Sequence, residues 1–299
     1  MSNKRLIDLL FFRYTIVEEP IRYESGGGFR LKDQRSIAMN ETATVMPLVR
    51  QMLNKVPEVT IFFWIIKIMA TTVGETAADF LTFNLNWGLT CTTLLVAGLL
   101  CVSLVIQFRA KKYVPWIYWL TVLLISVIGT LITDNLVDNF GVPLVTTTVI
   151  FAIALLATFT VWYASEKTLS IHSIYTSKRE SYYWLAILFT FALGTSAGDL
   201  LSEALDLGYW LSALLFAVLI GIVTVAYYRF KLNSVLAFWI AYILTRPLGA
   251  SIGDYLSQPS DERGLGLGTT GISVIFLLTI LGLVIYLTVT RRDEVNPLK

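Results

Sequence analysis

The first sign of chemistry in this sequence is a set of aspartates that lie inside apolar segments. Segments 64–79, 119–134, 184–199 and 239–254 each begin with Trp, carry Gly ten residues later and end with Asp. A carboxylate at the centre of a bilayer costs about 2.5–3.5 kcal/mol on insertion scales, so a repeated one is typical of a functional site. The repeated residues are Trp64, Trp119, Trp184 and Trp239, then Gly74, Gly129, Gly194 and Gly249, then Asp79, Asp134, Asp199 and Asp254.

The charged side chains in these segments favour cation or proton chemistry. Glu75 adds a fifth carboxylate to the four aspartates, and Lys67 and Arg246 are the basic residues. Hard oxygen ligands suit Mg²⁺, Mn²⁺, Ca²⁺ or protons better than Cu⁺ or Zn²⁺. We therefore expect the five carboxylates to bind protons or a metal ion, with Asp79, Asp134, Asp199 and Asp254 as its ligands. Lys67 and Arg246 would serve as internal counter-charges.

Two other interpretations of the same residues stay open. The aspartates could be architectural, accepting hydrogen bonds from Thr or Trp side chains and capping neighbouring helices. Alternatively, Lys67 and Arg246 could bind an anionic substrate while the acids carry protons. The single histidine, His172, argues against a His-rich metal site or a bis-His haem within one chain.

The spacing of the aspartates indicates how the elements that carry them are repeated. Successive aspartates are 55, 65 and 55 residues apart, so the first and third copies are 120 apart, as are the second and fourth. A fixed internal period is a strong signal of repeated architecture. It predicts a two-helix unit that was duplicated and then duplicated again.

Helical geometry places the repeated polar positions on one face. At about 100° per residue, the positions seven and eleven residues after each Trp fall close to the Asp. Because lipid cannot satisfy polar groups, we expect this face to point into the bundle. We expect the opposite face, which includes Val73, Ile128 and Leu248, to meet lipid. The inward positions are Thr71, Ser126, Phe191 and Arg246, then Glu75, Thr130, Thr195 and Ala250.

The remaining repeated residues suggest structural roles. Each Gly has a small residue or Thr four positions later, a small-xxx-small pair that is typical of close helix packing. Each Trp is expected to be an interfacial or packing anchor near the start of its helix. Pro247 follows Arg246 and predicts a kink that could act as a gate.

Composition predicts an all-α integral membrane protein. The chain has 299 residues, of which 56% are hydrophobic and only 15% charged, against about 25% charged in soluble proteins. Apolar runs of about 20 residues, the length that spans a bilayer, follow one another from Thr60 onward. Cys91 and Cys101 are expected to be buried small apolar residues. The eight predicted spans are about 60–82, 88–108, 115–137, 142–163, 182–204, 209–229, 234–256 and 270–290.

The predicted parts of the chain follow from these spans and from the charged loops. They are a cytoplasmic segment 1–58, a first half 59–163, a cytoplasmic linker 164–181, a second half 182–290 and a cytoplasmic tail 291–299. Residues 1–38 read as an extension ahead of Met39, with a short amphipathic segment at 5–17. Basic residues follow the second helix of each pair, so both termini are expected in the cytoplasm. All four repeats would then have the same orientation, with any pseudo-symmetry axis along the membrane normal.

Four tandem two-helix repeats, each with a Trp, and the signature FWIIKIMATTVGETAADFL at 63–81 resemble a known family. It consists of bacterial membrane proteins built from a repeat of unknown function, often called uncharacterised membrane-anchored proteins. The resemblance covers about 56–290. It implies an eight-helix protein of the bacterial inner membrane and supplies no reaction.

The function expected from these observations is secondary transport of a small cation. The cation would be a divalent metal such as Mn²⁺, or transport would be proton-coupled, and the metal would be substrate rather than cofactor. The alternative is a non-catalytic membrane scaffold or partner subunit. An enzyme is not expected, because the sequence has no HExxH or P-loop motif and its GLGLG at 264–268 lies in a loop. The expected partners are the lipid bilayer and a small cation, not nucleic acid.

Overall fold

The computed structural model describes residues 53–294, and in these residues every regular element is helical. Within this described part, eight helices are long and apolar enough to cross a membrane, which confirms the predicted fold class. Residues 1–52 and 295–299 lie outside the described residues, and with them the expected extension 1–38, the amphipathic segment 5–17 and most of the predicted tail. The long helices are α3 (Ile61–Asp79), α4 (Leu89–Arg109), α5 (Pro115–Asp134), α6 (Leu144–Glu166), α7 (Ser177–Asp199), α8 (Tyr209–Phe230), α9 (Ser234–Ser257) and α10 (Thr269–Thr290).

Local signals set the helix boundaries. The hydroxyls of Thr60 and Thr176 accept hydrogen bonds from the first turns of α3 and α7, and Pro115 occupies the first turn of α5. At their C-terminal ends, α6 and α8 stop at Lys167 and Lys231 in the left-handed conformation. Because α6 runs to Glu166 and α7 begins at Ser177, the segment between them is shorter than the predicted linker 164–181.

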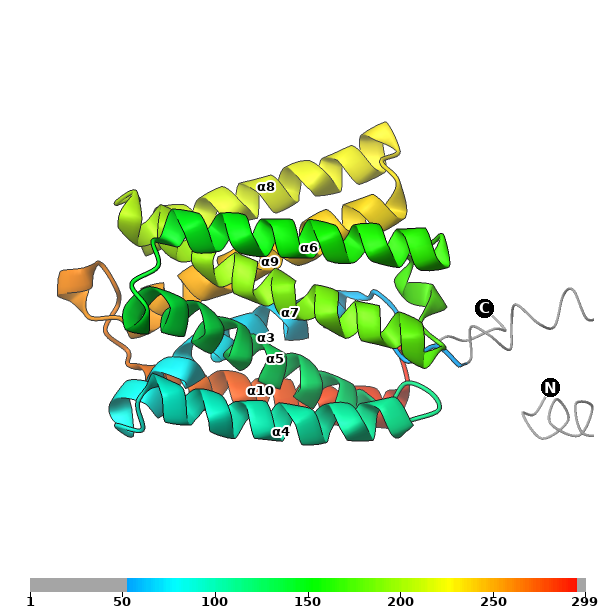
Figure 1. The fold of residues 1–299 in the computed structure, drawn as a ribbon, viewed down its shortest axis with the longest axis horizontal. Coiled ribbons are helices and arrows are strands. Elements are labelled where there is room, and N and C mark those ends of the chain that lie inside the picture. The colour runs from blue at the N-terminus through cyan, green and yellow to red at the C-terminus, as the bar shows by residue number, and fades with distance from the viewer. Residues whose placement is uncertain (1–52, 295–299) are drawn as a thin grey trace, which may run out of the picture. The chain divides into compact units, whose positions relative to one another are not determined.

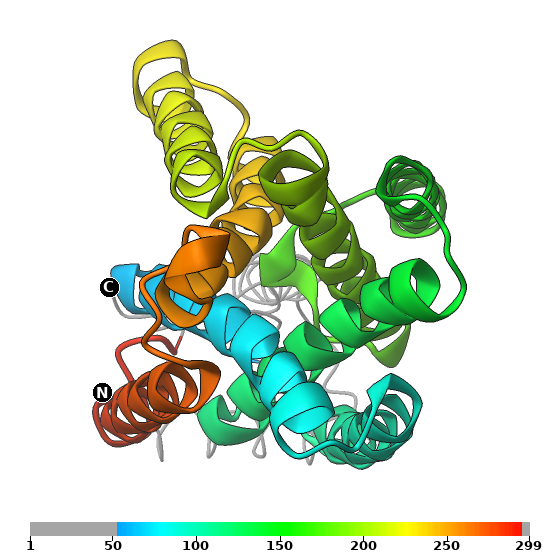
Figure 2. The same cartoon turned by 90° about the vertical axis from the view of Figure 1, so that its left-hand side faces the viewer.

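The first helices of the four repeats form a closed ring. In this ring α3 packs on α5, α5 on α7, α7 on α9, and α9 returns to α3. We call these four the inner helices, and we call their two ends the Trp end and the Asp end. Figure 2 views the bundle from the Asp end, with the inner helices around its centre.

The second helix of each repeat packs mainly on the first helix of the next repeat. Thus α4 covers α5, α6 covers α7, α8 covers α9, and α10 closes the cycle on α3. These outer helices lie around the ring in Figures 1 and 2. Their most apolar stretches are only 22–28% buried, against 56–72% for the inner helices. Exposed residues such as Leu94, Ile153 and Leu278 therefore form the surface that meets lipid.

Two predictions about exposure differ from the structure. The face of the inner helices that was expected to meet lipid is only partly exposed, since nine of its twelve residues are half-buried and Val73, Ile128 and Leu248 are buried. The physical reason is that the outer helices pack over that face. In contrast, Cys91 and Cys101 are exposed on α4 and not buried, because α4 turns only one side toward the ring.

The repeated glycines lie where neighbouring inner helices come closest. A Cβ built on Gly129 would lie 2.6 Å from the Cβ of Phe191 and 3.1 Å from the backbone nitrogen of Ala192. The other three glycines contact the next repeat at the same position, seven residues after its Trp. Those pairs are Gly74 with Ser126, Gly194 with Arg246, and Gly249 with Thr71. The four contacts form a cycle around the ring, and a larger side chain would push its helices apart.

Candidate functional site

The four repeated aspartates converge on one cavity at the Asp end of the ring. The cavity has a volume of about 150 Å³, and each inner helix contributes its Asp to the lining. Phe83 and Asp138 are exposed at its rim. The full lining is Glu75, Asp79, Phe83, Thr133, Asp134, Val137, Asp138, Leu144, Asp199, Asp254 and Gln258.

A change of helix type follows three of the four aspartates. Asp79, Asp134 and Asp199 each end an α-helix and lead into a π-helical turn, η1 (Phe80–Asn84), η2 (Asn135–Asn139) and η4 (Leu200–Ala204). Such single turns are rare and occur often at functional sites. They bring Phe83, Val137 and Asp138 to the cavity. In the fourth repeat α9 continues as an α-helix through Asp254 to Ser257, so the fourfold pattern is broken on this side.

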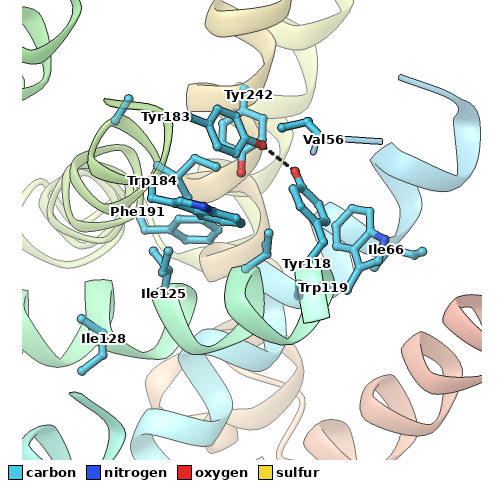
Figure 3. Packing of buried hydrophobic residues seen from close by; sticks show 14 of the residues in the cluster. Val56, Ile66, Tyr118, Trp119, Ile125, Ile128, Tyr183, Trp184, Phe191 and Tyr242 are labelled. Carbon is cyan, nitrogen blue, oxygen red and sulfur yellow. Dashed lines mark hydrogen bonds between the residues drawn. The ribbon is translucent and has the colours of Figure 1, made fainter. Parts of the chain in front are cut away.

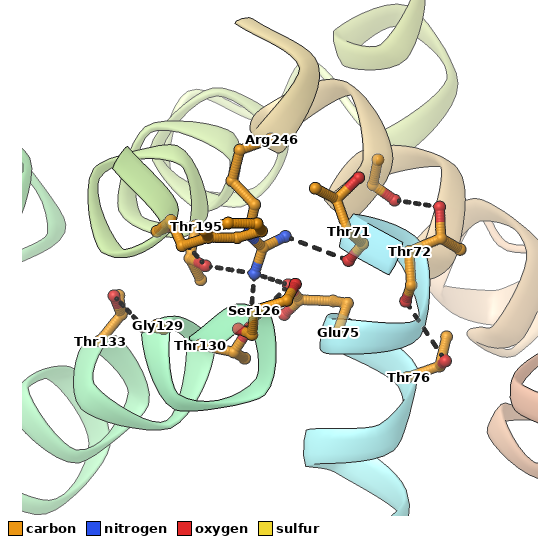
Figure 4. Close-up of polar contacts among 12 residues, drawn as sticks. Thr71, Thr72, Glu75, Thr76, Ser126, Gly129, Thr130, Thr133, Thr195 and Arg246 are labelled. Carbon is orange, nitrogen blue, oxygen red and sulfur yellow. Dashed lines mark hydrogen bonds and ion pairs between the residues drawn. The ribbon is translucent and has the colours of Figure 1, made fainter. Parts of the chain in front are cut away.

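An ion pair that involves Arg246 forms the polar layer next to the aspartates. The Arg246 side chain is fully buried, and its Nη2 lies 2.9 Å from Oε2 of Glu75. The same nitrogen donates to the hydroxyls of Thr130 and Thr195, the latter at 2.6 Å. Figure 4 shows the guanidinium reaching from α9 toward α3, α5 and α7. Glu75, Thr130 and Thr195 occupy the same position in three repeats, and Arg246 bonds to all three. We call these three residues the collar.

Lys67 lies deeper, on the Trp side of Arg246. Its Nζ is 4.2 Å from the ring centre of Tyr242 and 4.3 Å from that of Phe191. The side chain is fully buried, and among the described residues Nζ has no hydrogen-bond partner. The two bases that were expected to act as counter-charges therefore differ in their partners. The structure pairs Arg246 with Glu75, whereas no carboxylate in the described part forms an ion pair with Lys67.

Aromatic side chains close the axis at the Trp end. The residue before each Trp contacts the Trp of the next repeat, with ring centres 5.5–6.3 Å apart. The hydroxyls of Tyr118 and Tyr183 share a 2.5 Å hydrogen bond within this cluster, shown in Figure 3. The four contacts are Phe63 with Trp119, Tyr118 with Trp184, Tyr183 with Trp239, and Phe238 with Trp64.

The segment before α3 adds a second closure at this end. Lys55 is buried, and its Nζ lies 2.6 Å from Oε2 of Glu180 at the start of α7. The carbonyl of Asn54 accepts a hydrogen bond from the backbone of Tyr113. The Tyr113 hydroxyl donates a 2.6 Å hydrogen bond to Asp293, and burial raises the pKa of that carboxyl. The axis is thus sealed at the Trp end and hollow at the Asp end.

The donors in the cavity fit a hydrated cation or protons better than a bare metal ion. In the described residues no three His, Cys, Asp or Glu side chains stand close enough to hold one metal ion between them. The tentative metal site at the four aspartates is therefore not preformed as a ligand cage. A cation that keeps part of its water shell, as Mg²⁺ commonly does, needs the negative charge of the cavity but not direct ligation by every carboxylate.

Sequence reasoning named most of the charged groups of this site and missed others. All five candidate carboxylates, Asp79, Asp134, Asp199, Asp254 and Glu75, line the one cavity. Gln258, which donates a 3.3 Å hydrogen bond to Asp79, was missed because it lies four residues beyond the Trp–Asp segment of its repeat, at a position where the other repeats have Phe83, Asp138 and Glu203. Pro247 lies inside α9 beside Gly194, and its gating role stays a prediction.

Comparison with known proteins agrees with the internal repeat. One family model, described as a Repeat of Unknown Function (DUF347), matches four times, at residues 62–113, 117–168, 182–233 and 237–293. Each match begins just before the repeated Trp and ends beyond the outer helix of that repeat. No curated protein and no solved structure matches the chain.

Proposed function

The chain belongs to the family defined by this Repeat of Unknown Function, and from that premise and the geometry of its cavity we propose that it is a secondary transporter of a small cation. The family description supplies no activity, so the proposal rests on the site alone. The apolar outer helices identify a multi-pass membrane protein. The transported ion would be a divalent metal such as Mn²⁺, or a cation exchanged against protons.

The observation that carries the proposal is the convergence of carboxylates from all four repeats. Four aspartates, Glu75 and Asp138 line a cavity of about 150 Å³, and Arg246, paired with Glu75, is the base next to it. Like charges held this close repel one another unless a cation or protons neutralise them. An architectural role needs each Asp at its own helix end and does not require all four to share one cavity.

The closed Trp end supports alternating access. A transporter must open its site to one side of the membrane at a time, and this arrangement has a cavity at one end and packed aromatic rings at the other. If the basic loops lie in the cytoplasm, the cavity faces outward. The described arrangement then corresponds to an outward-facing transporter of the inner membrane.

Flux through reconstituted protein tests the proposal. Proteoliposomes with purified protein would be loaded with Mg²⁺, Mn²⁺ or Ca²⁺ in turn, and the metal retained would be measured by elemental analysis. Asp134→Asn keeps the shape of the side chain and removes its charge. We expect it to lower flux of the transported ion at least about tenfold, which corresponds to about 1.4 kcal/mol.

The matched control is Asp261→Asn, since Asp261 is an exposed acid in a loop at the same end and does not line the cavity. It should transport like the wild type. Equal flux for the Asp134 and Asp261 variants, or no flux of any cation by folded wild type, would contradict the proposal. The second of these results would favour the scaffold or partner-subunit alternative.

A further inference from the structure

Lys67 is a buried base that the packing of the ring does not require. It lies three residues after the Trp of the first repeat, where the other repeats have Val122, Ile187 and Tyr242. All four side chains at this position are fully buried. Two of the equivalents are aliphatic, so this layer of the ring can be filled without any charge. Packing alone therefore does not explain a lysine at this position.

The surroundings of Nζ act on its charge in opposite directions. The faces of the Tyr242 and Phe191 rings, at 4.2 and 4.3 Å, attract an ammonium ion. Against this, no oxygen in the described residues accepts a hydrogen bond from it, and an ammonium carries three donors. Burial without such acceptors favours the neutral amine. The two rings thus favour the charged form of Lys67, whereas burial without acceptors favours the neutral form.

Arg246 connects this balance to the cavity. Its guanidinium carbon lies 5.7 Å from the centre of the Phe191 ring, the same ring that contacts Lys67. Its Nη2 is held by Glu75, which lines the cavity. A cation that enters the cavity therefore adds to the positive field at Lys67. Glu75, Arg246 and the Phe191 ring are the groups that connect the cavity to Lys67. The other titratable groups turned toward this part of the axis are Tyr242 of α9, Tyr118 of α5 and Tyr183 of α7.

We propose that Lys67 is the proton-exchanging residue of the transporter, losing one proton when a cation occupies the acidic cavity and regaining it when the cation leaves. This inference rests on the proposed function and names its coupling ion. In the first step an N–H bond of the ammonium breaks, the electron pair stays on Nζ, and the proton passes to water.

Proton release on cation binding tests this inference. Purified protein in detergent and weak buffer would be titrated with Mn²⁺, and with Mg²⁺ and Ca²⁺ in parallel runs. A pH indicator would report protons and elemental analysis would report bound metal. Lys67→Met has a similar volume and no proton to lose. We expect it to bind the cation and to release about one proton fewer per bound ion than the wild type.

Two further variants separate coupling from packing. Ile187→Met changes the same layer in the third repeat and should release protons as the wild type does. Lys67→Arg keeps a permanent charge, so it should bind the cation more weakly and also lack the released proton. It provides the test if Lys67→Met does not fold.

The outcomes separate the two proposals. If folded wild type binds none of the three cations, the proposed function fails, and the coupling role fails with it. If wild type, Lys67→Met and Lys67→Arg bind a cation with equal proton release, the transporter proposal stands and the role of Lys67 is overturned.

Discussion

At the scale of single residues, the site combines a pairing that the fold satisfies with a base that it leaves without an acceptor. Arg246 and Glu75 are both buried, and Thr130 and Thr195 accept further hydrogen bonds from the guanidinium. Removing one partner of a buried ion pair leaves an uncompensated charge, whereas replacing both can be neutral. The collar is therefore expected to be sensitive to single changes and tolerant of a matched double change.

The Arg246–Glu75 pair gives the first stability prediction. Arg246→Met and Glu75→Leu should each destabilise the protein by about 3–5 kcal/mol, because the other charge stays buried. The double variant should be more stable than either single one. Thermal unfolding in detergent, followed by size-exclusion chromatography of the folded fraction, measures the order. Additive losses in the double variant would show that the pair is not energetically coupled.

The sequence predicts the identity of these groups better than their partners. Asp79, Asp134, Asp199 and Asp254 stand out because a local spacing repeats, and that signal needs no tertiary structure. Arg246 reaches Glu75 only because α9 closes the ring against α3, a contact between the fourth repeat and the first. Asp138 belongs to the cavity because a π-helical turn redirects the chain after Asp134, and no spacing announces such a turn.

At the scale of elements, the glycine contacts hold the inner helices at their separation. The Cβ missing from Gly129 would meet the Cβ of Phe191 and the backbone of α7, and backbone cannot move aside as a side-chain tip can. Hydroxyl bonds between helices lie beside these contacts. Thr133 donates to the Ala192 carbonyl at 3.2 Å, and Thr72 donates to the Gly249 carbonyl at 3.0 Å. Close backbone approach and hydrogen bonds between helices are the usual stabilising contacts in lipid.

Gly129→Ala tests this packing against a control in the same protein. The added methyl group should cost about 1–3 kcal/mol, the usual range for overpacking, and lower the temperature at which folded protein is lost. Gly98→Ala is the control, because Gly98 lies in α4 with no atom within 4 Å of an added Cβ. It should be neutral or slightly stabilising, since Ala favours a helix more than Gly does. Equal melting temperatures for the two variants would rule out a close-packing role for Gly129.

The prediction of elements succeeds where the signal is local and fails where it depends on neighbours. Apolar length gives all eight spans, and Pro115 or Thr60 marks where a helix begins. The prediction that one side of the inner helices meets lipid holds only in part, because each outer helix packs on the next repeat, which a single-helix pattern cannot reveal. The same pattern is ambiguous for α4, whose apolar residues surround it on all sides.

At the scale of the whole described bundle, a nearly fourfold scaffold carries an asymmetric site. Contacts of the glycines and of the aromatic residues each form a four-member cycle, so the repeats are equivalent as packing units. The charged residues are not equivalent, because Lys67 and Glu75 occur only in the first repeat and Arg246 only in the fourth. These two repeats adjoin where α3 meets α9, so the charged residues that occur in one repeat only lie at this closure of the ring.

The asymmetry of the site predicts which interface of the ring changes during transport. In a symmetric ring all four interfaces would open equally, whereas here the α3–α9 interface holds the buried ion pair and Pro247, which cannot donate a backbone hydrogen bond within α9. The interfaces of α5 with α7 and of α7 with α9 lack an acid–base pair of this kind in the described residues. The change in access is therefore expected at α3 and α9.

The orientation of the bundle gives the last prediction. Basic residues such as Lys111 and Lys112 follow α4 at the Trp end, while Asp261 lies in the loop after α9 at the Asp end. Because short basic loops stay in the cytoplasm, a membrane-impermeant maleimide added to intact cells should label Asp261→Cys and not Lys111→Cys. Cys91 and Cys101 are exposed on α4, so both are first replaced by Ser to remove background. After the cells are permeabilised, both introduced cysteines should react. Labelling of Lys111→Cys alone in intact cells would show the opposite orientation, in which the acidic cavity opens to the cytoplasm.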